Sequence, residues 1–267
     1  MKRYSLILTT AAVILGMLSC NKVEEPYLKD ITVDGARVVL LEDYTGIRCT
    51  NCPAAAETAH ELLERYPNNL VVLSVHAGAQ SQPMPGMPDF TTEAGTTWYN
   101  TFDFSANPIG TVNRFRKSSG YGYNDGEWGT KIQEEINEGQ SADITINPAY
   151  NESTRKLDIC INSLFTKEIE GDFYLFACIM EDSIQGYQST PTGHNPDYWH
   201  CHVFRTPING TWGQPLFNGL TEIDQEFETN LSITLDTTYR DNQCYVVSYI
   251  YDSSDKYIIQ ACQKKIK

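Results

Sequence analysis

Two kinds of hydrophobic patterning follow one another along the chain, and the change comes near residue 140. Before it, residues 36–46 and 69–78 are nearly unbroken apolar runs, which are typical of strands buried on both faces of a parallel sheet. Between these runs, residues 53–67 repeat apolar positions at helical spacing, with Pro53 suited to the first turn. This strand–helix–strand order predicts two parallel strands joined by a right-handed crossover.

The rest of the first part is less regular. Residues 78–106 are rich in Gly, Pro and Thr, so we interpret them as an insertion, with a short helix near residues 92–100. Residues 107–115 return to strand character. Residues 127–139 place Trp128 and two isoleucines on one face of a closing helix.

From residue 141 onward the hydrophobic pattern has a period of two, as half-buried strands require. Seven strand candidates follow, at residues 142–150, 156–165, 172–181, 198–205, 230–236, 243–252 and 256–264. Short strands with turn residues between them predict an antiparallel β-sandwich. The expected fold class is therefore an α/β domain over residues 36–140, followed by an all-β sandwich domain over residues 141–267.

The charge of the chain argues against nucleic acid as a partner. The formal net charge is −14, whereas phosphate recognition needs clustered Lys and Arg. The longest basic run is the last four residues, which is more typical of a solvated terminus.

The N-terminal segment has the pattern of an export signal. A basic pair precedes an uncharged, largely apolar run at residues 5–19, which is shorter than the ~20 residues of a membrane-spanning helix. The run ends in a sequence that resembles a bacterial lipobox, whose cysteine, here Cys20, is acylated with chains such as palmitate. Residues 1–20 are therefore expected to be a lipoprotein signal peptide with its lipobox cysteine, and residues 21–35 a tether. The alternative is ordinary signal cleavage, in which Cys20 is lost.

The stretch Cys49-Thr50-Asn51-Cys52 ends the first predicted strand and opens the first predicted helix. Export gives the pair an oxidising context in which a disulfide persists. At a helix N-terminus, free N–H groups and the helix dipole stabilise a thiolate. Three interpretations stay open: a redox-active pair in which Cys49 attacks and Cys52 resolves, a structural disulfide, or part of a zinc site. Zinc has the least support, because a second Cys-x-x-Cys is missing, so no metal or cofactor is expected.

The surroundings of the pair resemble the thioredoxin-like superfamily. Asp43 stands six residues before Cys49, where the superfamily has a buried acid that assists proton transfer from the second cysteine. Pro108 resembles the cis-proline that faces the cysteines. The resemblance implies a thioredoxin-like first domain with Cys49, Cys52, Asp43 and Pro108 as catalytic residues. The arginine before the first cysteine departs from the pattern, which often has an aromatic residue there.

Residues 198–205 hold the second cluster of reactive side chains. On a strand, His200 and His202 would point to one face and Cys201 to the other. The two histidines could share a metal, although a hydrogen-bonded strand face explains them equally. Arg205 is expected to form a salt bridge across the sheet, and together with His200 and His202 it is a candidate binding residue.

The two clusters together resemble the 28-kilodalton outer-membrane-protein-related lipoprotein family of Bacteroidetes. Its acid-aromatic-Thr-Gly run before Cys-x-Asn-Cys-Pro is matched by residues 43–53. Its Tyr-x-His-x-His stretch, followed by Asn-Gly-Thr-Trp-Gly, is matched within residues 198–213. The resemblance implies a thioredoxin-like domain followed by a β-sandwich. It also implies a lipid-anchored protein of the outer membrane, periplasmic or surface-exposed.

Two functions stay open. The first is thiol–disulfide exchange with a protein thiol as partner, and whether the chain is such an enzyme is not decided by the sequence. The second is a surface-exposed binding, adhesin-like or receptor lipoprotein, in which the cysteine pair is a structural disulfide and the partner is a surface ligand. In both, Cys20 holds the protein at the membrane.

Overall fold

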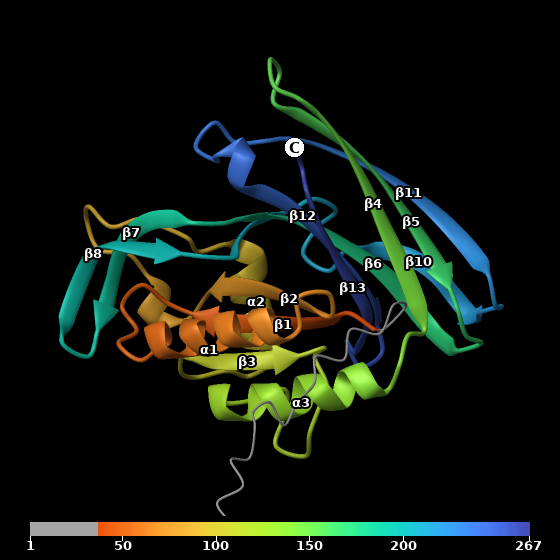
Figure 1. The fold of residues 1–267 in the computed structure, drawn as a ribbon, viewed down its shortest axis with the longest axis horizontal. Helices are drawn as coiled ribbons and strands as arrows, with labels where there is room; N and C mark the ends of the chain where they lie inside the picture. Colours follow the sequence, from red (N-terminus) through yellow and green to blue (C-terminus); the bar gives the residue numbers. More distant parts are fainter. Residues whose placement is uncertain (1–36) are drawn as a thin grey trace, which may run out of the picture. The chain divides into compact units, whose positions relative to one another are not determined.

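The computed structural model describes residues 37–267, which form a mostly β structure with several sheets (Figure 1). In chain order the elements are β1 (Val39–Thr45), α1 (Cys52–Arg65), β2 (Leu70–His76), the 3-10 turn η2 (Ala79–Ser81), α2 (Glu93–Thr101), β3 (Ile109–Val112), α3 (Asp125–Asn137), β4 (Ala142–Asn151), β5 (Lys156–Phe165), β6 (Glu170–Glu181), β7 (Ile184–Thr190), β8 (Gly193–His200), β9 (Val203–Pro207), β10 (Gln214–Leu220), β11 (Gln225–Thr234), the 3-10 turn η3 (Asp241–Gln243), β12 (Cys244–Asp252) and β13 (Ile258–Lys265). The expected mixed fold, with helices confined to the first part, is confirmed at this level.

β1 and β2 are parallel neighbours, as the apolar runs predicted. Val39 lies opposite Leu70, and Thr45 lies opposite His76. Every residue of both strands is buried, which is why neither strand shows an apolar–polar alternation. β3 pairs antiparallel with the other edge of β1, and α1 forms the predicted crossover.

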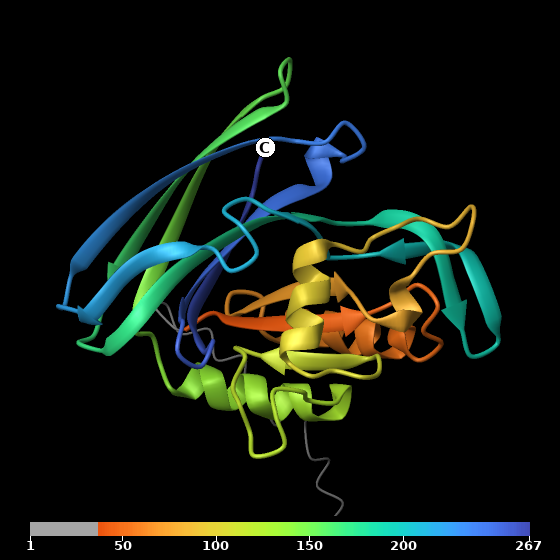
Figure 2. The same cartoon turned by 180° about the vertical axis from the view of Figure 1, so that it is seen from behind.

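Helices cover both faces of this part of the sheet. α1 and α3 lie on one face, where Leu62 and Trp128 pack with Leu41 and other apolar residues of β1 and β2. α2, the yellow helix in Figure 2, lies on the opposite face and buries Trp98 there. α2 also confirms the short helix expected within residues 78–106. Alternate residues of β1 therefore face two different helical layers.

The sheet continues from β2 into strands from the second half of the chain. Its order is β13-β12-β6-β9-β2-β1-β3, with β10 also paired to β6. β9 makes the junction: it is parallel to β2 through Ser74 and Val203 and antiparallel to β6. Strands from both sides of residue 140 thus share one sheet, while the domain boundary at that residue stays a prediction.

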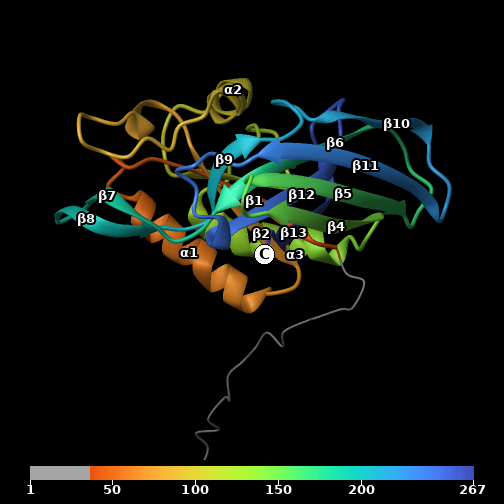
Figure 3. The same ribbon diagram turned by 90° about the horizontal axis from the view of Figure 1, so that it is seen from above.

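A second sheet, in the order β11-β5-β4, packs against the β6, β12 and β13 part of the large sheet (Figure 3). Ile159 and Ile161 of β5 join Ile179 and Val246 of the large sheet in one apolar cluster. Buried and exposed residues alternate along β4 and β5, as the period of two predicted.

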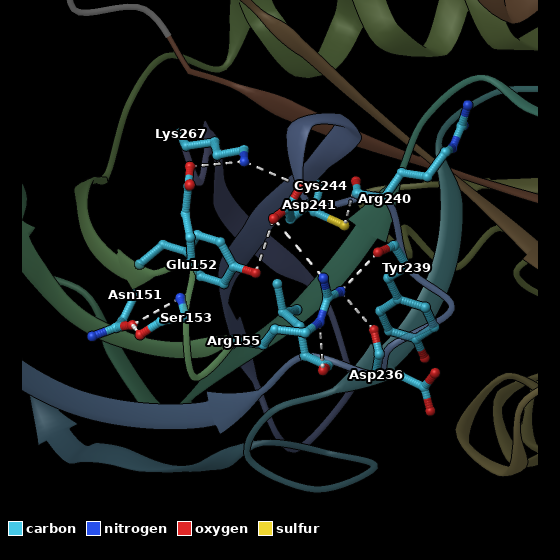
Figure 4. Close-up of polar contacts among 12 residues, drawn as sticks. Asn151, Glu152, Ser153, Arg155, Asp236, Tyr239, Arg240, Asp241, Cys244 and Lys267 are labelled. Atoms are coloured by element: carbon cyan, nitrogen blue, oxygen red, sulfur yellow. Dashed lines mark hydrogen bonds and ion pairs between the residues drawn. The ribbon is translucent and has the colours of Figure 1, made fainter.

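A polar cluster ties the β4–β5 turn to the segment before β12 (Figure 4). The Arg155 guanidinium donates from Nη2 to the carbonyl oxygens of Asp236 and Tyr239, each at 2.7 Å. The Lys267 ammonium lies 3.2 Å from Oδ1 of Asp241. Backbone carbonyls are the main acceptors of Arg155, so the cluster stabilises the fold by holding the two segments together.

A buried ion pair joins β1 to Arg114, just after β3, and Arg114 in turn reaches the second half of the chain. Arg114 and Glu42 are both inaccessible to solvent, and two hydrogen bonds of 2.6 and 3.0 Å join them. Arg114 also donates to the Tyr249 hydroxyl at 2.7 Å, and its guanidinium lies 5.0 Å from the ring centre of Trp98. This pair lies on the α2 side of the sheet.

Candidate functional site

Cys49 and Cys52 form a disulfide at the start of α1. The loop before them turns tightly against η2, where the Arg48 amide donates to the Gln80 carbonyl at 2.9 Å. Gly46 permits this approach, because a Cβ at that position would lie 2.7 Å from the Gln80 carbonyl. The prediction that the pair opens the first helix is confirmed, and the helix N-terminus points its free N–H groups toward the pair.

Asp43 lies beneath the start of α1, on the face of β1 that α1 and α3 cover, whereas Glu42 points to the other face. It is only 2% exposed, and its Oδ1 atom has no hydrogen-bond partner. Burial raises the pKa of the Asp43 carboxyl to about 7, and the charge of Asp125 adds to the rise. The predicted acid is therefore a buried carboxyl that takes up or releases a proton near neutral pH.

A cavity of about 20 Å³ separates the cysteine pair from the sheet. Its walls come from β1, α1 and β2 and from the segment that ends β8. The lining residues are Asp43, Thr45, Cys52, Ala56, Ser74, His76, Tyr198, His200 and Cys201. The two clusters that the sequence singled out, more than a hundred residues apart, thus meet in one place.

Two buried histidines form one wall of this cavity. The rings of His76 and His200 lie 5.5 Å apart, and Phe90 packs against both. Neither ring nitrogen of His76 has a partner, whereas Nε2 of His200 lies 3.1 Å from the Tyr187 carbonyl. Burial lowers the pKa of His200 to about 4 and that of His76 well below its usual range, so both rings are neutral at neutral pH. Within residues 37–267, no three acidic, cysteine or histidine side chains are arranged to hold a metal ion.

The hairpin of β7 and β8 lies beside the start of α1 (Figures 1 and 3) and contacts the loop of the disulfide. Its Gln188 side chain donates to the Cys49 carbonyl at 2.8 Å and to the Gly46 carbonyl at 3.2 Å. The next backbone amide, of Ser189, donates to the Ile47 carbonyl at 2.8 Å. With this cover in place, Cys49 is 1% exposed and Cys52 is 2% exposed.

Sequence reasoning missed this hairpin. Most of its residues are half-buried or exposed, so it carries no apolar alternation. The tight turn at residues 191–193, with Pro191 and Gly193, is the one signal that could have indicated a hairpin.

Pro108 lies at the start of β3, and the Asn107–Pro108 peptide bond is cis. The Asn107 side chain donates to the carbonyl oxygens of Thr45 at 3.0 Å and Ala77 at 2.8 Å, which holds the segment against the ends of β1 and β2. Pro108 lines a separate cavity of about 590 Å³ together with Phe104. It does not line the small cavity of Asp43 and the cysteine pair.

Residues 198–205 do not form the single strand that was predicted. β8 ends at His200 and β9 begins at Val203, because His202 adopts a left-handed φ of 57° that interrupts the extended backbone. The prediction that His200 and His202 share one strand face is therefore wrong. His200 lines the small cavity, whereas His202 packs beside Asp182, with Nδ1 4.0 Å from its carboxylate.

Arg205 forms the salt bridge expected across the sheet. Its Nε atom lies 3.4 Å from the Glu181 carboxylate on β6, and its guanidinium lies 4.4 Å from the ring centre of Tyr239. These contacts engage Arg205 within the fold, and Arg205 does not line the small cavity.

A larger cavity, of about 370 Å³, lies between α1 and the end of β8. Trp199, which is 54% exposed, stands at this cavity. The lining residues are Ala56, Glu57, Ala59, His60, Val72, Ser74, Asn195, Asp197, Tyr198, Trp199, Cys201 and His202. Cys201 lines both this cavity and the small one, so it lies between them.

The expected lipidation residue, Cys20, lies outside the described residues, as do the signal segment and the tether. In the part of the chain from residue 37 onward, no helix has the length and apolar character needed to cross a membrane.

Comparison with known proteins gives both fold and family. The fold is similar to that of HBP35 of Porphyromonas gingivalis, with a TM-score of 0.67 at 17% identity, over 87% of this chain and 76% of that one. A protein of Agrobacterium tumefaciens is similar with a TM-score of 0.52 at 12% identity, over 88% of this chain and 97% of that one. No curated protein sequence matches this chain.

The family model of the outer membrane protein Omp28 matches residues 95–267. The match covers more than half of the chain and includes the second sequence cluster with its Tyr-x-His-x-His stretch. It confirms the family resemblance of the sequence and the expected localisation at the outer membrane: the chain belongs to the outer membrane protein Omp28 family.

Proposed function

We propose that this chain is a lipid-anchored, outer-membrane thiol–disulfide exchange protein. A thioredoxin-like domain over residues 36–140 carries the Cys49–Cys52 pair, and a β-sandwich domain over residues 141–267 follows it. The observation that carries the proposal is the buried Oδ1 atom of Asp43, which has no hydrogen-bond partner, in the cavity that Cys52 also lines.

A buried carboxyl without a partner destabilises a fold, because its charged form loses hydration and gains nothing in return. A disulfide that only braced the start of α1 would need no such group. A proton acceptor with a pKa of about 7 is, in contrast, what thiol chemistry near neutral pH requires. Asp43 therefore fits a redox-active cysteine pair better than it fits a structural disulfide.

The roles follow from position. Cys49 precedes α1 and leaves as a thiolate that the helix N-terminus stabilises. Cys52 lines the cavity with Asp43, so Asp43 exchanges the proton of the Cys52 thiol. Pro108 is held by its neighbour Asn107 against the ends of β1 and β2, and its proposed role is to shape the substrate groove from the separate cavity that it lines.

The topology supports the thioredoxin-like assignment. A parallel β1–α1–β2 unit is extended by an antiparallel β3 and closed by α3 on the same face as α1. The cysteine pair stands where β1 passes into α1, and a cis-proline precedes β3.

One observation favours a second candidate function. Both cysteines are almost fully buried beneath the β7–β8 hairpin, as a structural disulfide would be. In that case the chain is a binding or adhesin-like lipoprotein, and the cavity beside the exposed Trp199 is a candidate contact surface.

The reduction potential of the Cys49–Cys52 pair separates the two functions. The full chain in detergent is equilibrated with glutathione buffers, and the reduced fraction is trapped by alkylation. Exchange-active pairs lie at roughly −270 to −120 mV, whereas structural disulfides lie below about −300 mV. We expect a value in the first range. A pair that stays oxidised below the second limit would assign the binding function instead.

A further inference from the structure

We propose that Cys201 is a third redox-active thiol, which exchanges with Cys52 and passes the disulfide between the covered pair and small thiols at the protein surface. The proposal rests on the proposed exchange function and adds the route by which a buried pair is reached.

The position of Cys201 carries the argument. It lies in the two-residue break between β8 and β9, and it lines the small cavity together with Cys52. It also lines the larger cavity beside Trp199, and it is itself exposed. Of the described free cysteines, 160, 178, 201, 244 and 262, only Cys201 lines the cavity of the pair. Cys201 is thus the thiol that touches both the site and the solvent.

Polar groups in the small cavity indicate chemistry there beyond packing. Oδ1 of Asp43 and both ring nitrogens of His76 are buried without a partner, and both residues line the cavity between Cys52 and Cys201. The residues are 2% and 3% exposed. Such groups stay unpaired in a core at a cost in stability, so their place in the cavity that Cys52 and Cys201 also line points to a proton that moves there.

The direct route to the pair is closed. Where the first cysteine of a Cys-x-x-Cys pair is exposed, an outside thiol can attack it directly. Here Gln188 and Ser189 fasten the hairpin over Cys49, which is 1% exposed. An attack through Cys201 needs no opening of the hairpin.

The exchange needs no added oxidant, because the small thiols supply the electrons that reduce the pair. The Cys201 thiol gives its proton to the Asp43 carboxylate, and the resulting thiolate attacks Sγ of Cys52. The Cys49–Cys52 bond breaks, a Cys52–Cys201 bond forms, and Cys49 leaves as a thiolate. A small thiol at the larger cavity then attacks Cys201 and releases Cys52, so the small thiol forms a mixed disulfide and the buried pair becomes a dithiol. A second small thiol attacks the mixed disulfide on Cys201, restores the Cys201 thiol and leaves as the disulfide of the two small thiols. These two thiols supply the two electrons, and their two protons, one by way of Asp43, end on Cys49 and Cys52.

The nucleophilicity of the Cys201 thiolate and the leaving tendency of Cys49 agree with an exchange in which Cys201 attacks and Cys49 leaves. Partial burial of the thiol, with the charge of Asp182 adding to it, raises the pKa of Cys201 to about 11. This disfavours the thiolate, so the attack depends on a base such as Asp43, but the thiolate is a strong nucleophile once it has formed. Cys49 stands at the helix N-terminus, which favours it as the leaving thiolate.

The first test uses disulfide mapping of full-length Cys49→Ser protein. Mild oxidation with glutathione disulfide is followed by acid quenching, trypsin digestion without reductant and mass spectrometry. We expect the peptide of residues 49–65 joined to that of residues 168–205, with fragmentation assigning the bond to Cys201 and not to Cys178. The Cys49→Ser, Cys201→Ser double variant should lack this product. Absence of the joined peptide in the single variant overturns the proposal.

The second test measures the rate at which dithiothreitol reduces the Cys49–Cys52 pair in the full chain. We expect Cys201→Ser to be reduced at least tenfold more slowly than the parent, and Cys262→Ser at the parent rate. Equal rates for the parent and Cys201→Ser, with a potential in the exchange range, overturn the Cys201 route and leave the exchange function intact. A pair in the parent that resists dithiothreitol and has a potential below the exchange range overturns both.

Discussion

Asp43 and Glu42 are neighbours in the chain, and the core treats their carboxyl groups in opposite ways. Glu42 points toward α2 and is paired with Arg114 and the Thr111 hydroxyl. Asp43 points toward α1, and its Oδ1 meets no donor. The alternation of a strand is enough to give one acid several partners and to leave an oxygen atom of the other without one.

Asp43→Asn should stabilise the protein in a way that depends on pH. The folded pKa of about 7 lies above the ordinary value of 3.8, so the folded state holds more protons than the unfolded state between these values. Stability therefore falls as pH rises through this window, by up to about 4 kcal/mol. We expect the variant to exceed the parent by up to that amount at pH ~8 and to match it near pH ~4, measured by urea unfolding.

Glu61→Gln, which neutralises an exposed acid on α1, is the matched control and should show no such difference. A parallel shift of Asp43→Asn at both pH values would contradict a raised folded pKa.

Arg114→Met should destabilise the protein strongly. It removes one partner of a pair that is fully buried and leaves the Glu42 carboxylate without its charge partner. Such changes cost about 3–5 kcal/mol. Lys156→Met removes one partner of an exposed pair and should cost less than about 1 kcal/mol. Denaturant midpoints at equal slope give the comparison, and equal losses in the two variants would be the contrary result.

At the scale of elements, the hydrophobic periodicity of a strand decides whether that strand can be predicted from the sequence. β1 and β2 are continuous apolar runs and β4 and β5 alternate, so these strands are predictable from their own residues. β10 and the β7–β8 hairpin carry neither pattern, because the hairpin is held by Gln188 to a carbonyl 139 residues earlier. The cysteine pair and Asp43 could be predicted as a site, but the segment that closes it could not. Even the break at His202 depends on a single backbone angle.

Gln188→Ala should make the disulfide easier to reduce. The substitution removes the side-chain hydrogen bonds to the Cys49 and Gly46 carbonyls, which hold the hairpin down. A loss of about 1.4 kcal/mol of closing free energy raises the open fraction about tenfold. We expect a rise of that order in the dithiothreitol reduction rate when Gln188→Ala and its control are made in the Cys201→Ser background, where only the direct route through the hairpin remains.

Gln185→Ala on the same strand provides the control, because its side chain contacts only the exposed Asp197 carboxylate. If the two variants react at the same rate, Gln188 does not govern access.

At the scale of the whole molecule, the described chain is built around one sheet that takes strands from both sides of residue 140. The outer-membrane family and the expected lipid anchor add a position in the cell envelope. The cysteine pair thus belongs to a protein of the outer membrane, in a compartment where disulfides persist.

Cys20→Ala should release the protein from the membrane. The variant loses the residue that is expected to be acylated, and the described part from residue 37 has no helix that could span a bilayer. We expect the variant in the soluble fraction of the envelope and without incorporated palmitate. Cys262→Ser should stay in the membrane fraction and carry the label. Retention of Cys20→Ala at the membrane would mean that another segment anchors the chain.

The cover over the cysteine pair also has a consequence for the order of events during biogenesis. Cys49 and Cys52 leave the export machinery well before Gln188, since chains emerge N-terminus first. In that interval the nascent pair stands open to the large oxidising catalysts of the envelope. Once residues 184–200 arrive and the hairpin closes, those catalysts are shut out. We therefore expect large oxidising catalysts to reach the pair only before the hairpin closes, and the folded protein to exchange its disulfide only with thiols small enough to enter the cavities.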